Sequence, residues 1–310
     1  METGEIDLDR IDGAFDLQAT VESGQTYLWD RWDGLMYDSQ PVQGGDAWYH
    51  TVVPPITGVT SETIAVRVRQ TGDIQSGRLE WEATTDATSL LTHLLRLDDD
   101  LDGILETTPN IELLDDAYRT YRGMRLVRDP PFPCLISFIC SAQMRVARIH
   151  GMQQRLAKQY GSTLSLDGRQ YHAFPTPAEL AASTEQELRD LSLGYRAPYV
   201  QRTAEMVDDD EADPAATTDM EYETAREYLT QFVGVGDKVS DCVLLFSTGF
   251  LQAVPLDTWI RTAISEYFPD CDRGNYADTS AAIREQLGGE YAGYAQTYVF
   301  LYLRETGVGS

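Results

Sequence analysis

The spacing of apolar residues changes near residue 87, and this change does most to limit the folds open to the chain. In 64–69 and in 78–83, apolar and charged residues alternate with the period of two that is typical of half-buried strands. Paired glycines at 44–45 and paired prolines at 54–55 separate the segments of this first part. After residue 87 the spacing becomes helical, and no further strand is predicted. The sequence therefore predicts an α+β fold, with an N-terminal antiparallel β-sheet domain followed by an all-helical domain.

Three segments of the second part carry clear signals. The apolar positions of 135–149 suit a mostly buried helix or a pair of helices, and 291–304 is predicted to be an amphipathic helix of about four turns. The acidic, proline-containing residues 208–219 are expected to form a solvated loop. We expect the sheet domain, with a trailing helix, to span 1–115 and the helical domain to span 116–310.

Acidic residues are spread along the whole chain. There are 50 Asp and Glu residues against 24 Lys and Arg residues, which gives a net charge of -26. Such a surface is expected of an intracellular protein in the cytoplasm or nucleoid of a halophilic prokaryote, although an acidic protein of an ordinary cytoplasm is the alternative. The first thirty residues lack the basic start and apolar run of a signal peptide. Apolar runs such as LISFIC are far shorter than the roughly 20 residues of a membrane span, so we expect neither export nor a membrane partner.

The four cysteines predict no metal centre. Cys134, Cys140, Cys242 and Cys271 show no paired CxxC spacing, and three of them lie in apolar helical surroundings where free thiols are common. We therefore expect no disulfide, no metal and no other cofactor.

One segment is basic. Residues 117–158 contain eight basic side chains and one acid, a local charge of +7. In molar salt the screening length is only about 3 Å, so direct contacts alone still count. This basic island is the best candidate footprint for an anionic partner, and the alternative is that its arginines pair with acids elsewhere in the fold.

The segment 224–248 predicts two helices joined by a tight glycine turn, because TAREYLTQF is followed by VGVGD and then by KVSDCVLLFS. Gly234 and Gly236 permit a sharp turn whose free amides can bind a phosphate oxygen. Asp237 is the predicted N-cap, which puts Lys238 in the first helical turn, where the helix dipole and apolar neighbours disfavour the protonated amine. A neutral lysine amine is a nucleophile, although a solvated surface lysine is the alternative.

A carboxylate follows in QAVPLDTWI, residues 252–260. Asp257 follows apolar residues. Taken alone, it would be interpreted as the N-cap of the next helix and nothing more. Together with Lys238 it suggests a more specific chemistry. The amine can form a Schiff base, while the carboxylate stabilises positive charge developing at a sugar carbon and accepts a proton.

These blocks resemble those of the helix-hairpin-helix DNA glycosylases, and among them the 8-oxoguanine DNA glycosylases that are also AP lyases. The resemblance covers most of the chain, and its blocks occur in the family's order: GQTYLW, LISFICSAQMRVARIHGM, YHAFP, LRDLSLGYRAPYV, GVGDKVSDC, QAVPLD and EYAGYAQTYVF. It implies base excision repair by base flipping and Schiff-base chemistry on damaged double-stranded DNA, and we expect a monomer. Lys238 would attack C1′ of the sugar and Asp257 would be the catalytic carboxylate. The amides of Gly234, Gly236 and Val239 would hold a phosphate.

The resemblance also implies a set of base contacts. The carbonyl of Gly24 would accept the N7 hydrogen that 8-oxoguanine has and guanine lacks. Cys242 and Phe300 would sandwich the flipped base, and Gln296 would bond its Watson-Crick edge. Gln296 and Phe300 are spaced i and i+4, which puts them on one helix face.

The chain departs from the family pattern where the family contacts the opposite strand. Gln143 would fill the hole left by the flipped base, with Arg148 and Arg196 as helpers and Tyr195 as the wedge. Trp259 replaces a histidine that contacts a phosphate, and Val233 replaces a proline of the hairpin.

Two other functions stay open from the sequence. A monofunctional alkylpurine glycosylase of the 3-methyladenine type would use the aspartate without the lysine, so Lys238 disfavours it. A non-catalytic helix-hairpin-helix DNA-binding protein would need neither Lys238 nor Asp257.

Overall fold

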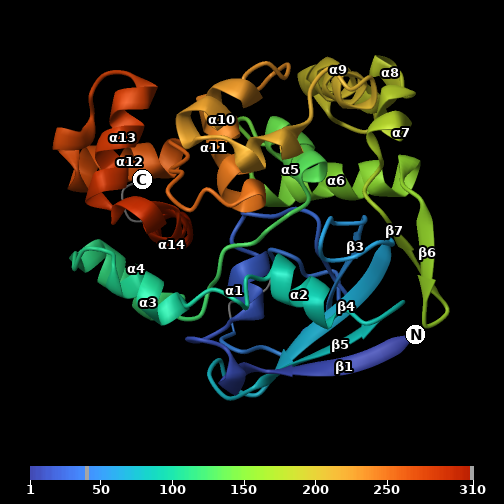
Figure 1. Cartoon of the computed structure of the whole chain (residues 1–310), viewed down its shortest axis with the longest axis horizontal. Coiled ribbons are helices and arrows are strands. Elements are labelled where there is room, and N and C mark those ends of the chain that lie inside the picture. Colours follow the sequence, from blue (N-terminus) through green and yellow to red (C-terminus); the bar gives the residue numbers. More distant parts are fainter. Residues whose placement is uncertain (39–41, 308–310) are drawn as a thin grey trace.

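The computed structural model describes residues 1–38 and 42–307. A sheet lies at one side of the molecule, and most of the helices lie on the other side (Figure 1). The predicted α+β class is thus confirmed, and the two predicted strands are β4 and β5.

Five antiparallel strands form the sheet in the order β1-β5-β4-β3-β2. The strands are β1 (Glu2–Asp7), β2 (Asp30–Arg31), β3 (Tyr49–Val53), β4 (Ile64–Thr71) and β5 (Arg78–Ala83). Trp81 of β5 is paired with Gly4 on one side and with Val68 on the other. A Cβ on Gly4 would lie only 2.4 Å from the Trp81 ring, so glycine is required there. The apolar face of the sheet packs on α1 (Leu17–Val21) and α2 (Thr88–Leu94).

The helices α5, α6, α9, α10, α11 and α14 share one large apolar core. The helices after the sheet are α3 (Leu101–Glu106), α4 (Glu112–Thr120), α5 (Pro131–Ile139), α6 (Val146–Tyr160), α7 (Pro177–Ala181), α8 (Glu185–Asp190), α9 (Ala197–Asp208), α10 (Tyr222–Leu229), α11 (Asp237–Val243), α12 (Thr258–Tyr267), α13 (Tyr276–Gln286) and α14 (Ala292–Thr306). A smaller core joins α4, α12, α13 and α14. The segment 135–149 is therefore a helix pair, one of the two predicted arrangements.

The prediction that no strand follows residue 87 is wrong. Thr163–Leu166 (β6) and Arg169–His172 (β7) form an antiparallel hairpin. Its turn residues Asp167 and Gly168 both have positive φ, 51° and 71°. Asp-Gly is the residue pair that such a two-residue turn favours, so the signal was present in the sequence.

Two helical predictions also need correction. The segment 208–219 is not entirely loop, because Pro214–Asp219 forms a 3-10 helix in which Pro214 and Thr217 are buried. The helix predicted at 291–304 is α14, but ten of its fifteen residues are buried, so it is a central helix rather than an amphipathic surface helix.

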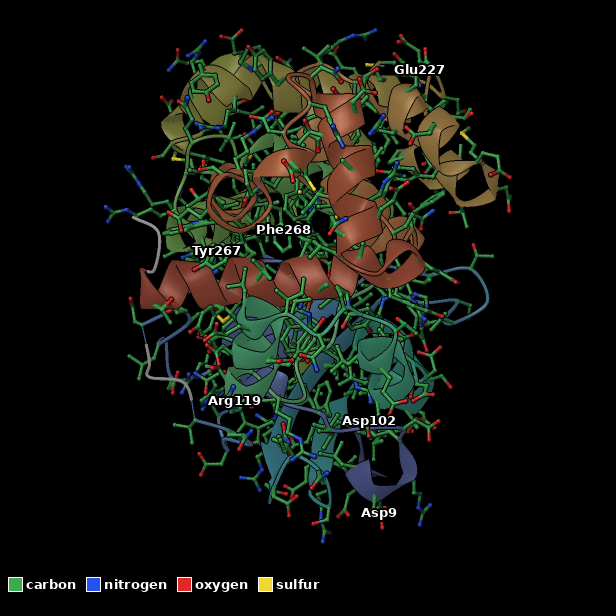
Figure 2. All side chains as sticks on the ribbon, turned by 90° about the vertical axis from the view of Figure 1, so that its left-hand side faces the viewer. Asp9, Asp102, Arg119, Glu227, Tyr267 and Phe268 are labelled. Carbon is green, nitrogen blue, oxygen red and sulfur yellow. The ribbon has the colours of Figure 1, made fainter. Side chains whose placement is uncertain are left out.

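Helix α14 joins the two parts of the molecule. The hydroxyl of Tyr294 donates to Asp99 at 2.5 Å, and the hydroxyl of Tyr298 donates to the carbonyl of Met124 at 2.6 Å. Figure 2 shows α14 crossing between α4, which carries Arg119, and the helical part that carries Tyr267 and Phe268. The N-terminal segments are thereby fixed against the helices that follow.

The predicted domain boundary after residue 115 falls inside α4, so the exact division stays a prediction. Residues 308–310 of the predicted second domain lie outside the described residues. Within 1–38 and 42–307, every helix is too short or too polar to cross a membrane.

Candidate active site

The turn between α10 and α11 requires glycine at one position. Gly234 has φ of +84°, and a Cβ there would lie 2.6 Å from the ring of Tyr199. Gly236 is the N-cap of α11, and a Cβ there would meet no described atom within 4 Å, so its surroundings are open. The predicted N-cap Asp237 is wrong: it is the first residue of the helix, and its carboxylate faces Arg226 at 3.9 Å instead of capping an amide.

Lys238 follows in the first turn of α11 and is half-buried. Its Nζ donates a hydrogen bond to Oγ of Ser141 at 3.2 Å and lies 5.4 Å from the centroid of the Phe138 ring. Phe138 is itself stacked on Phe246, at a centroid distance of 5.6 Å. The amine therefore lies against apolar rings and bonds the uncharged hydroxyl of Ser141.

Asp257 lies at the start of α12. Its Oδ1 accepts a hydrogen bond from the backbone N–H of Ile260 at 2.8 Å, so it is the N-cap. Burial raises the pKa of Asp257 above its ordinary value, while the charge of Lys238 and the backbone N–H groups of Ile260 and Trp259 act in the opposite direction. The lysine and the carboxylate thus influence each other across a shared space.

That space is a pocket of about 920 Å³. It lies between α5, the start of α6, α11, α14 and the segment around Gly24. Predicted site residues that line it are Gly24, Gln143, Lys238, Val239, Cys242, Asp257, Gln296 and Phe300. Residues from both ends of the chain therefore line one pocket with the predicted catalytic pair.

Gly24 forms one end of the pocket. Its φ is +94°, and a Cβ there would lie 2.8 Å from Nη1 of Arg304 and 2.9 Å from the side chain of Val146. Arg304 donates to the carbonyl oxygens of Ser23 at 2.6 Å and Glu22 at 3.1 Å. The backbone at Gly24 is thus fixed to α14 by the guanidinium.

The other predicted base contacts come from two helices. Cys242 of α11 is buried, and burial raises the pKa of its thiol to about 12, so it is an uncharged apolar contact. Gln296 of α14 is buried and donates to Oγ1 of Thr297 at 2.7 Å. Phe300, one turn further along, lies under Arg304 at 5.4 Å.

The residues predicted to contact the opposite strand do not all reach the surface. Gln143 is exposed in the turn between α5 and α6 with φ of +55°, and Arg148 is exposed at the start of α6. Tyr195 is exposed as well. Arg196 is buried, donates to the carbonyl of Ala142 and stacks on Tyr195 at 4.3 Å. Arg196 therefore braces the turn that carries Gln143.

Two of the three predicted hairpin amides are free of backbone acceptors. The N–H of Val239 donates to the carbonyl of Gly236 at 2.9 Å. Within the described residues, the N–H groups of Gly234 and Gly236 make no such bond. Of the three predicted amides, those of Gly234 and Gly236 are therefore available to a phosphate at this turn.

The basic island is partly structural. Arg125 is buried and bonds backbone carbonyls, while Arg119 and Arg128 pair with acids. Arg145 and Arg148 are exposed, and Arg145 lines the pocket. The alternative of arginines paired within the fold thus holds for part of the island, while the anionic footprint stays a prediction for Arg145 and Arg148.

Three further residues, Ser141, Arg304 and Tyr27, line the pocket although the sequence did not single them out. Ser141 ends the block FICS, but its place beside Lys238 depends on the packing of α5 against α11, which the sequence does not show. Arg304 gave no signal, because its partners Glu22 and Ser23 are remote in the sequence. Tyr27 lies three residues after Gly24 and is buried.

Comparisons with known proteins identify the family of the chain. The sequence profile of the HhH-GPD superfamily base excision DNA repair proteins matches residues 136–287. The N-glycosylase/DNA lyase of Saccharomyces cerevisiae is 32% identical over 275 residues, which cover 81% of this chain and 68% of the yeast protein. A probable N-glycosylase/DNA lyase of Methanothermobacter thermautotrophicus is 29% identical over 323 residues and covers 96% of each chain.

Solved structures show the same fold. MBOgg1 in complex with a low affinity DNA ligand has a TM-score of 0.81 and 26% identity, with 99% of this chain and 100% of that chain covered. An 8-oxoguanine glycosylase/lyase of Clostridium acetobutylicum, solved with double-stranded DNA that contains cytosine opposite 8-oxoG, has a TM-score of 0.80 and 24% identity. It covers 99% of both chains, and at this identity the likeness shows the fold alone.

A helix-hairpin-helix whose second helix carries a pocket lysine, with a carboxylate at the same pocket, is the arrangement that the sequence predicts for a base excision enzyme. The chain belongs to the HhH-GPD superfamily of base excision DNA repair proteins. Within that superfamily it is an N-glycosylase/DNA lyase.

Proposed function

We propose that the enzyme removes 8-oxoguanine from duplex DNA and then cleaves the strand at the resulting abasic site. The pocket that brings Gly24 and Gln296 to Lys238 and Asp257 carries this proposal. It has room for a flipped purine nucleotide, and reactions on a base require that the nucleotide leaves the duplex.

Lys238 is the nucleophile in this proposal. Its Nζ forms a bond to C1′, the glycosidic bond breaks, and the base leaves with the bonding electron pair and takes up a proton that the attacking nitrogen releases. Asp257 stabilises the positive charge that develops on the sugar. Ring opening then gives a Schiff base on Lys238, loss of the C2′ proton follows, and the 3′ phosphate is eliminated.

The segment at Gly24 selects the base. Its carbonyl oxygen is a pure acceptor, so it can bond the N7 hydrogen of 8-oxoguanine and opposes the N7 lone pair of guanine. Arg304 supports this selection because it fixes the two preceding carbonyl groups. Gln296 bonds the Watson-Crick edge, and Cys242 and Phe300 pack on the two faces of the base.

The contacts with the DNA backbone are made by few groups. The amides of Gly234 and Gly236 donate to a phosphate at the hairpin, and the exposed Arg145 and Arg148 supply further phosphate contacts. Gln143 fills the gap in the duplex and Tyr195 wedges beside it, with Arg196 acting through the Ala142 carbonyl. A single chain supplies all of these groups, so we expect the monomer to be active.

We also infer that the enzyme works in the salt-rich cytoplasm of a halophilic prokaryote. The net charge of -26 supports this inference, since acidic side chains keep a surface hydrated in high salt. Activity should therefore persist in molar potassium chloride, where binding that depends on long-range attraction is lost.

The test is a duplex with one 8-oxoguanine opposite cytosine, incubated in high potassium chloride with borohydride to trap the Schiff base. The chain has two lysines, Lys158 and Lys238, so Lys158→Gln is a matched control for Lys238→Gln. We expect a covalent adduct from the wild type and from Lys158→Gln, and none from Lys238→Gln. An adduct with Lys238→Gln, or faster release of 3-methyladenine than of 8-oxoguanine by the wild type, would contradict the proposal.

A further inference from the structure

The two catalytic groups lie on separate elements, so something must fix the distance between them. Lys238 is on α11, whereas Asp257 follows the irregular segment 249–256 and begins α12. A segment without regular hydrogen bonds sets such a distance poorly by itself, and a misplacement of about 1 Å can cost about 100-fold in rate.

Asp241 is buried on α11, three residues after Lys238. Its Oδ1 accepts a hydrogen bond from the hydroxyl of Tyr222 at 2.6 Å, and its Oδ2 accepts one from the hydroxyl of Tyr276 at 2.7 Å. Tyr222 is the first residue of α10, and Tyr276 is the first residue of α13. One carboxylate thus holds three helices together.

Of the two phenols, only that of Tyr276 makes a further hydrogen bond within the described residues, to the residue next to Asp257. The hydroxyl of Tyr276 also accepts a hydrogen bond from the backbone N–H of Leu256 at 3.1 Å. Leu256 is buried and directly precedes Asp257. The hydroxyl therefore uses its proton on Asp241 and a lone pair on Leu256, which links α11 to the residue next to the catalytic carboxylate.

The hydrogen bonds between α11 and the two tyrosines are strong because their shared acceptor, Asp241, is a buried carboxylate. Burial raises the pKa of Asp241 to about 6, and the two phenols and the neighbouring Arg226 and Arg284 oppose this effect. At neutral pH the carboxylate is ionised, and hydrogen bonds to a charged acceptor are shorter and stronger than neutral ones.

We propose that Tyr276 is a positioning residue, which through Asp241 and the Leu256 amide sets the separation of the Lys238 amine from the Asp257 carboxylate. This inference rests on the proposed roles of those two groups. Tyr222 makes the same bond to Asp241. Its ring centroid lies 6.0 Å from that of Phe250, but among the described residues its hydroxyl makes no hydrogen bond to the backbone beside Asp257. Because Tyr222→Phe keeps the ring and removes only the hydroxyl, Tyr222 serves as the internal control.

The experiment compares Tyr276→Phe with Tyr222→Phe. For each variant, kcat and KM are measured for base release, the borohydride trapping rate is measured at a preformed abasic site, and Tm is measured by calorimetry. We expect Tyr276→Phe to lower kcat and the trapping rate by about 10- to 100-fold with KM unchanged. Tyr222→Phe should stay within about 2-fold of the wild type while losing a similar amount of Tm.

Equal losses in the two variants, or a wild-type kcat in Tyr276→Phe, would overturn the inference. If Tyr276→Phe does not fold, Asp241→Asn provides the same test, because the amide keeps an acceptor oxygen while the charge is lost; kcat should fall with KM unchanged, and an unchanged kcat would overturn the inference. Trapping at an abasic site needs no particular base. A wild type that traps there but releases no 8-oxoguanine would therefore overturn the lesion assignment alone, and the Tyr276 comparison would still be decided by the trapping rates.

Discussion

The catalytic wall of the pocket (Lys238 and Asp257) and its base wall (Gly24, Gln296 and Phe300) differ in how the chain builds them. The catalytic wall comes from one continuous stretch, in which a glycine turn, a helix start and an N-cap each follow from local residues. The base wall joins a loop near the N-terminus to the last helix. Arg304 holds those two segments together through the carbonyls of Glu22 and Ser23. Local sequence thus indicates the groups of the proposed chemistry, whereas the groups proposed to select the base are brought together by long-range contacts.

The largest effect is expected at the catalytic wall. Lys238→Gln removes the nucleophile, so both base release and strand cleavage should fall by at least about 1000-fold. Single-turnover rates on 8-oxoguanine duplex would measure this, with Lys158→Gln as the control. Residual strand cleavage above about a tenth of the wild-type rate would show that another group forms the Schiff base.

A substitution at Gly24 is expected to cause a smaller loss, which affects the rate of base release and not strand cleavage at an abasic site. Gly24→Ala would put a Cβ 2.8 Å from Arg304 at a positive φ, so the carbonyl must shift. Base release should fall about 100-fold. Gly34→Ala is the matched control, because Gly34 also has positive φ, +74°, but its Cβ would meet no atom within 4 Å. Equal losses in both variants would mean that backbone strain, and not the pocket, causes the effect.

Gln296→Leu should have a weaker effect at the same wall. Loss of one hydrogen bond to the base costs about 1 kcal/mol, which corresponds to roughly a 5- to 10-fold lower rate of release. Guanine and 8-oxoguanine offer the same Watson-Crick edge, so the preference for 8-oxoguanine should not change. A changed preference, measured as the ratio of the two release rates, would assign selectivity to Gln296 instead of Gly24.

The smallest effect on the rate is expected from a change of pH near neutrality, which acts through Asp257. The carboxylate acts when ionised, and burial raises its pKa above the ordinary value of 3.8, so the rate should begin to fall at a higher pH than an exposed aspartate would give. Because the folded pKa exceeds the unfolded pKa, ionisation of Asp257 lowers the free energy of unfolding as pH rises through this interval.

Asp257→Asn should consequently be much less active, yet have a higher Tm than the wild type at pH 7. The difference in Tm should shrink as the pH is lowered toward about 4, near the ordinary pKa of an aspartate. A Tm difference that does not depend on pH would show that the carboxylate is not destabilised by its burial.

The contrast between the walls also explains what the sequence could predict. Strands β4 and β5, the hairpin at Gly234 and the N-cap at Asp257 follow from local patterns, and the structure has them. The β6–β7 hairpin was also predictable, because Asp167-Gly168 is a strong turn signal that was overlooked.

Other features could not be predicted because they depend on distant partners. The burial of Arg196 follows from its bond to Ala142, and the role of Arg304 follows from a loop at the other end of the chain. The prediction that Asp237 is the N-cap of α11 was wrong by a single residue. The helix begins one residue earlier than expected, so Gly236 is the N-cap.

The most direct test of the central claim is borohydride trapping by Gly24→Ala and Lys238→Gln on two duplexes, one with 8-oxoguanine and one with a preformed abasic site. If the walls have separate tasks, Gly24→Ala should trap poorly with 8-oxoguanine but at nearly the wild-type rate at the abasic site. Lys238→Gln should trap neither duplex. Equal impairment of Gly24→Ala on both duplexes, in a folded protein, would contradict the division of the pocket into a catalytic wall and a base wall.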